Sequence, residues 1–188
     1  MSQSLVLAGL LLASGLVPTT AVVGAAPLGL VAVGPAARPP AEIVLTPADL
    51  GPDFVVASSG QTTILERGSF GQSIRRGNLL ASSLVPEGIV GVRTVALVLP
   101  DVPTSDRAFQ DIATQILEGF QEAPLPALAE RARGGIAWGQ RPFEPASILV
   151  IFRTGTTVGF VATFAFDAPT SMDDTVRLAQ IMIARARG

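Results

Sequence analysis

The sequence predicts an α+β fold, with an antiparallel sheet and two main amphipathic helices packed on one face of it. The strongest observation is the stretch 147–187, where the pattern indicates strand, tight turn, strand and helix. A second observation is the stretch 92–120, where a strand pattern is again followed by a helix pattern. The chain has 188 residues, which suffices for one domain with a substantial core and a leader.

The two strands of the C-terminal stretch differ in pattern. Residues 147–152 form a continuous apolar, β-branched run, whereas residues 158–166 alternate between large and small side chains. Gly155 lies between them and can adopt the positive φ of a tight hairpin turn. The large side chains, such as Phe160, predict a face that receives helices. The small face, which includes Gly159, is expected to meet solvent or a ligand.

The helix expected at residues 172–187 has start and stop signals at both ends. Thr170 or Ser171 can cap its first turn, two aspartates follow, and arginines occupy the last turn. One apolar stripe runs along it: Met172, Val176, Ala179, Ile183 and Ala186.

Two short sequence matches favour an internal strand–helix repeat. Residues 92–96 match 158–162, and residues 101–105 match 167–171, with the same spacing in both cases. The alternative is coincidence, because Asp-x-Pro-Thr-Ser is a common way to begin a helix.

The remaining elements are predicted from shorter patterns. A turn organised by Thr46 or Asp49 precedes the first strand. The run 88–99 is apolar on both faces apart from two residues and is expected in the interior of the sheet. A short helix is expected at 127–133, ended by the glycine pair that follows. Further strands are expected at 54–58, 62–66, 69–75 and 136–140, and the run 79–85 fits either a strand or a helix.

The first 37 residues carry no charged side chain, and residues 5–17 have the length of a signal-peptide apolar region. Residues 1–37 are therefore predicted to be a signal peptide or an N-terminal membrane anchor, although Pro18 and Pro27 interrupt a full membrane span. Residues 38–44 are expected to form a linker, and residues 45–188 a single domain.

Composition excludes several chemistries. The chain has no Cys, His, Lys or Tyr, so it can form neither a Ser-His or Cys-His nucleophile pair nor a zinc site of the usual kind. The net charge of −2 argues against a nucleic-acid partner. We therefore expect no enzymatic activity, no cofactor and no metal. The acidic residues at 173–174 fit a helix start better than a metal site.

A candidate ligand face is formed by Arg93, Trp138, Val161 and Thr163. Arg93 interrupts an apolar strand, and Val161 and Thr163 lie on the small-residue face. Trp138 can form the floor of a ligand pocket, although a role in the core or at a sheet edge also fits. Two carboxylates, Glu130 and Glu144, could perform acid–base chemistry if they met, but their spacing fixes no distance.

Three segments carry a resemblance to a known group of proteins: 45–54, 152–158 and 178–185. The first resembles the opening, and the other two the closing hairpin and helix, of a largely uncharacterised family of exported bacterial proteins and lipoproteins. The resemblance implies an envelope domain similar to extracellular sensor domains and PsbP-like α+β domains. It supplies no catalytic residues, and this chain lacks the lipobox cysteine.

These observations favour a non-catalytic, exported envelope domain that binds a small ligand or an envelope protein. Contact with a membrane is expected only through the N-terminal segment, if it stays uncleaved. Two alternatives remain open: a carboxylate-dependent hydrolase acting on cell-envelope glycan, and a structural or oligomeric scaffold.

Overall fold

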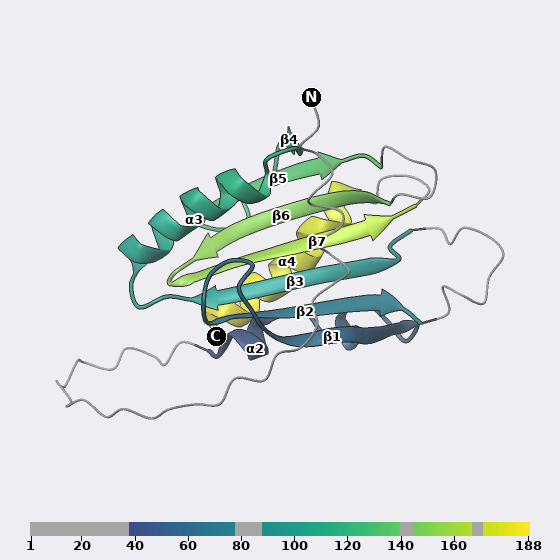
Figure 1. Ribbon diagram of the computed structural model, residues 1–188, viewed down its shortest axis with the longest axis horizontal. Helices are drawn as coiled ribbons and strands as arrows, with labels where there is room; N and C mark the ends of the chain where they lie inside the picture. Colours follow the sequence, from purple (N-terminus) through teal and green to yellow (C-terminus); the bar gives the residue numbers. More distant parts are fainter. Residues whose placement is uncertain (1–37, 78–87, 140–144, 167–170) are drawn as a thin grey trace. The chain divides into compact units, whose positions relative to one another are not determined.

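The computed structural model describes residues 38–77, 88–139, 145–166 and 171–188, and in these ranges the protein is α+β as predicted (Figure 1). One seven-stranded antiparallel sheet has the strand order β1-β2-β3-β7-β6-β5-β4. The strands are β1 (Phe54–Thr62), β2 (Ser69–Arg76), β3 (Gly91–Val98), β4 (Gln121–Ala123), β5 (Arg131–Ala137), β6 (Ala146–Thr154) and β7 (Thr157–Ala165). The helices are α2 (Pro40–Ile43), the 3-10 turn η1 (Pro47–Asp49), α3 (Val102–Ile116) and α4 (Met172–Arg187). The predicted leader and the run 79–85 lie outside the described residues.

The two long helices pack on opposite faces of the sheet, so the prediction of a single helix-bearing face is wrong. Phe152 and Val161 belong to the buried cluster that contains the apolar side chains of α4. Their neighbours Ile151 and Phe160 belong to a second cluster, which contains the apolar side chains of α3. Figure 1 shows α4 crossing behind the strands. Because β6 and β7 are apolar on both sides, each side of the sheet requires its own cover.

The two strand–helix units, β3–α3 and β7–α4, do not form a symmetric repeat. Their strands are antiparallel neighbours in the sheet. A two-fold axis relating such neighbours runs normal to the sheet and would place both helices on the same face. Since α3 and α4 lie on opposite faces, the matching segments are similar local sequences rather than a rotational repeat. The expected interior position of β3 is confirmed, because it lies between β2 and β7.

Short-range signals place the Gly155 turn and the cap of α4 as predicted, and α3 also begins at a local cap. Asp101 caps α3 by accepting a hydrogen bond from the Thr104 backbone N–H at 2.7 Å. Ser171, one of the two predicted caps, accepts from the Asp174 N–H at 3.3 Å. Gly155 has a φ of +54° in the two-residue turn between β6 and β7.

The prediction of a helix at 127–133 that ends at a glycine pair is wrong. Residues 131–137 form strand β5, and the pair at 134–135 lies inside this strand. A Cβ on Gly134 would lie 2.9 Å from Leu125 Cδ2, and one on Gly135 would lie 2.7 Å from Phe120 Cβ. The pair therefore permits close packing on both faces of β5. A second correction concerns 62–66: β1 ends at Thr62, and the following loop buries Leu65 in the cluster under α3.

The segment expected to be a linker contributes to the core. Residues 40–43 form α2, and Ile43, Val44 and Leu45 are each no more than 1% exposed. Arg185 of α4 donates a hydrogen bond to the Val44 carbonyl and pairs with Asp49, both at 2.7 Å. Packing therefore begins before residue 45. The predicted turn is confirmed, because Thr46 and Asp49 form reciprocal cap bonds around η1.

Candidate functional site

Two residues of the predicted ligand face, Val161 and Thr163, are completely buried under α4. The Thr163 hydroxyl oxygen lies 2.7 Å from that of Thr175 on α4. The expectation that this small-residue face is open is therefore wrong. Small side chains here allow the helix to pack closely against the strand.

The other two residues of that prediction lie elsewhere. Arg93 pairs with Ala162 in the β3–β7 ladder, so its side chain projects from the face opposite to Val161 and Thr163. Trp138 follows β5 and is 56% exposed. Strands β7 and β6 separate β3 from β5, so the four residues do not form one surface.

Part of the α3 side of the sheet is uncovered by any described helix. On this side α3 packs against β6 and β7, and Leu65 packs in the same cluster. Beyond them lies a contiguous set of partly or fully exposed residues, which we name the Arg75–Arg93 face: Ser73, Arg75, Gly91, Arg93 and Phe164. The register places them together, because Gly91 pairs with Arg75 on one side and Phe164 on the other, while Arg93 pairs with Ser73.

Gly91 leaves space at the centre of the Arg75–Arg93 face. A Cβ at this position would lie 3.7 Å from Phe164 Cδ2, so a larger side chain would fill the space beside the ring. Arg75 and Arg93 are diagonal neighbours across β2 and β3, which places their Cβ atoms roughly 7 Å apart. Two long guanidinium side chains at this spacing can reach the same ligand.

Arg93 differs from the other arginines that are at least partly buried in the described ranges. It has neither a carboxylate partner nor a side-chain hydrogen bond among the described residues, and burial lowers the pKa of its guanidinium, which stays charged at neutral pH. The comparable arginines each have a partner: Arg133 with Glu122, Arg153 with Asp106 and Glu130, Arg185 with Asp49, and Arg76 over the ring of Phe54. Arg93 therefore offers unused N–H donors in a partly buried position.

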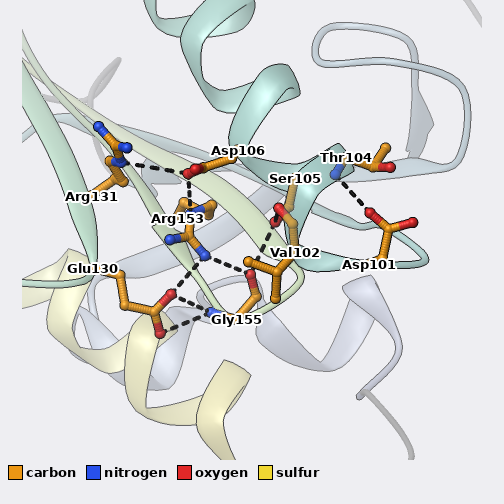
Figure 2. Close-up of polar contacts among 9 residues, drawn as sticks. All are labelled: Asp101, Val102, Thr104, Ser105, Asp106, Glu130, Arg131, Arg153 and Gly155. Carbon is orange, nitrogen blue, oxygen red and sulfur yellow. Dashed lines mark hydrogen bonds and ion pairs between the residues drawn. The ribbon is translucent and has the colours of Figure 1, made fainter.

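A second charged cluster joins α3, the β6–β7 hairpin and the loop before β5 (Figure 2). Arg153, with a side chain only 8% exposed, pairs with Asp106 at 2.9 Å and with Glu130 at 2.6 Å. It also donates to the Gly155 carbonyl, while Glu130 accepts from the Gly155 N–H at 3.0 Å. Arg131 approaches Asp106 at 3.4 Å. We name this group the Arg153 clamp.

The Arg153 clamp fits a structural role better than an acid–base role. The Glu130 carboxylate is already engaged by the buried Arg153 guanidinium and by the Gly155 backbone N–H, so its oxygens hold the hairpin turn in place. Its suggested partner Glu144 lies outside the described residues. One sequence signal points to the clamp, namely an arginine directly after an apolar strand, but the turn pattern around Gly155 does not reveal its partners.

A hollow of about 330 Å³ lies between β5 and the loop before it, and its lining includes Glu122, Leu125, Glu130, Arg133 and Gly134. Its charged groups already have partners, because Arg133 pairs with Glu122 and Glu130 with Arg153. Within the described ranges, no three acidic side chains gather where a metal ion could bind. The same ranges contain no helix with both the length and the apolar character needed to cross a bilayer.

Comparisons with known proteins give little further information. No protein-family model matches the chain, and no curated protein matches it. Among solved structures, the extracellular domain of PknH from Mycobacterium tuberculosis is similar with a TM-score of 0.45 and 8% sequence identity. The likeness covers 81% of this chain and 99% of that chain. At this level it decides nothing about function.

Proposed function

We propose that the protein is a non-catalytic, exported domain that binds an anionic group through the Arg75–Arg93 face. One observation carries the proposal: Arg93 is partly buried and unpaired among the described residues, whereas the other partly buried arginines have partners. A cation held in this way gains more from an incoming anion than a fully hydrated one.

The chemistry of the face indicates the class of ligand. Guanidinium groups bind carboxylate or phosphate oxygens through paired N–H donors. Phe164 adds a partly exposed ring, and Gly91 leaves space beside it. The preferred ligand therefore carries a carboxylate or phosphate next to an apolar portion. A small molecule and a segment of an envelope protein both meet this description.

Two further observations support a binding role outside the cytoplasm. The sequence lacks the side chains of the common nucleophilic and zinc mechanisms. The uncharged residues 1–37 match the pattern of a secretory leader or anchor. Fractionation of cells followed by N-terminal sequencing tests export, and recovery of the intact leader on cytosolic protein would contradict it.

The binding proposal is tested with full-length protein immobilised and exposed to an envelope extract, with captured molecules identified by mass spectrometry. Arg93→Gln removes the unpaired cation. Arg177→Gln is the matched control, because Arg177 is exposed on α4, has no ion pair among the described residues, and its loss changes net charge equally. Loss of a charge-assisted bond is expected to weaken capture by about tenfold or more for Arg93→Gln.

Salt provides a second readout. Capture by the wild type and by Arg177→Gln is expected to weaken as ionic strength rises, because the exposed Arg75 contributes a screened attraction. Equal capture by Arg93→Gln and Arg177→Gln would place the site elsewhere. Conversion of a captured molecule into a product would contradict the non-catalytic role.

A further inference from the structure

We infer that the free edge of β1 pairs with β1 of a second copy of the protein. β1 forms one end of the sheet and pairs only with β2 among the described strands. Its nine residues leave a long row of backbone donors and acceptors on the outer side. Such a row is a template for an added strand.

The two edges of the sheet are protected very differently. β4, at the other end, is three residues long, includes the charged Glu122 and is followed by Pro124. β1 contains neither a charged residue nor a proline, and Val55 and Val56 are 42% and 47% exposed. Natural edges are usually blunted by charge, proline or short length. β1 has none of these three features, although a bulge at Ala57 interrupts its register.

The absence of charge from β1 favours a second copy as the occupant. In an antiparallel pair related by a two-fold axis, a residue on one side of the axis faces the residue at the same distance on the other side, so a charge near the axis would lie close to its own copy. No residue from 54 to 62 is charged, so this penalty is absent. A charged partner would find no counter-charge along the strand. The two edges also match in length.

The pairing would join the two sheets with their α3 sides facing the same way, because the two-fold axis of an antiparallel pair is normal to the sheet. Val55 pairs with Arg75 of β2 and therefore shares its side of the sheet. Dimerisation would thus bury exposed valines of both copies and place two Arg75–Arg93 faces on one continuous surface. A single strand pair buries less than a standard interface, so we expect a weak, concentration-dependent dimer.

The test measures the mass of the full-length protein by sedimentation or light scattering over a range of concentrations. The wild type is expected to approach twice the mass of one chain as concentration rises. Val56→Lys places a charge on the edge of both copies, and its dissociation constant should rise by about tenfold or more. Val102→Lys is the matched control, because Val102 is 46% exposed on α3, away from the edge.

Ser59→Lys acts on the same edge through a different residue, and far-ultraviolet circular dichroism checks that each variant is folded. A wild type that stays monomeric at every concentration would overturn the inference, as would equal association by Val56→Lys and Val102→Lys. A monomer whose β1 edge binds an unrelated extended peptide would assign the edge to another partner and also overturn it. Arg93→Gln should dimerise like the wild type, so failure of anion binding and failure of pairing are distinguishable.

Discussion

The two faces of the sheet are closed to different extents. On the α4 side, buried apolar residues continue from β2 to β6, including Ile74, Val92 and Phe152, with α2 and α4 packed over them. On the α3 side, the buried cluster stops near Ala162, and the neighbouring Arg93 and Phe164 stay partly exposed. The difference arises within single strands, because successive residues such as Val92 and Arg93 face opposite sides.

This comparison separates what stabilises the domain from what is available for binding. The buried clusters on both sides contribute to the free energy of folding, because they remove apolar surface from water, but the α4 side leaves less of its surface accessible. Beyond its buried cluster, the α3 side carries the side chains of the Arg75–Arg93 face, which are less buried and remain accessible. Changes on the α4 side should therefore affect stability, and changes on the Arg75–Arg93 face should affect binding.

The largest expected effect comes from comparing two phenylalanines. Phe152 is 0% exposed and lies against Gly159 on the α4 side, so Phe152→Ala should lower the free energy of unfolding by about 3–5 kcal/mol. Phe164 is only partly buried, and Phe164→Ala should cost about 1.5 kcal/mol or less. Urea denaturation of both variants measures the difference.

The control is the slope of the unfolding free energy against urea concentration. An unchanged slope shows that the unfolded states of the variants are comparable. Equal losses for the two variants would mean that the α3 side is closed as tightly as the α4 side. That result would also weaken the assignment of Phe164 to a binding surface.

Local features of the fold could be predicted from sequence because they depend on neighbouring residues. The helix starts at Asp101 and Ser171 and the turn at Gly155 all follow from interactions over a few positions. The face of the sheet on which each helix packs could not be predicted from the sequence. Residues 158–166 are apolar on both faces, so either face could have received a helix. The helix end predicted at 134–135 is wrong for a similar reason, since a glycine pair suits both the end of a helix and a closely packed strand.

The candidate site shows the same limit. Arg93 was identified because it interrupts an apolar strand, which is a local signal. Its neighbours on the face depend on the β2–β3 register, and no short-range pattern pairs Arg75 with Gly91. Size and chemistry alone suggest one surface for Val161, Thr163 and Arg93, but strand alternation and α4 place Val161 and Thr163 on the other side.

The Arg153 clamp provides the second prediction, of intermediate size. Arg153→Met removes the buried cation and leaves Asp106 and Glu130 without their main partner, which should lower the free energy of unfolding by about 1–3 kcal/mol. Arg131→Met is the control, because Arg131 is 49% exposed and its pair with Asp106 is longer, so about 0.5 kcal/mol or less is expected. Similar losses for both variants would show that the buried guanidinium does not carry the clamp.

The smallest predicted effect tests how the N-terminal turn is held to α4. Burial alone would raise the pKa of the Asp49 carboxyl, but the Thr46 N–H and the Arg185 guanidinium outweigh it, so the pKa is lowered. Because the unfolded chain then binds the proton more readily, Asp49 contributes stability above its ordinary pKa of about 4 and loses it as pH falls further.

Asp49→Asn should therefore be less stable than the wild type at pH 6, by about 0.5 kcal/mol given solvent screening, and the difference should shrink below about pH 4. Arg185→Gln should show a similar but weaker convergence, since the Thr46 bond remains. Denaturation at several pH values measures both. A difference that stays constant down to pH 3 would mean that Asp49 acts through neutral hydrogen bonding alone. The closure of the α4 side at this turn would then depend on the packing of Ile43, Val44 and Leu45, rather than on the ion pair.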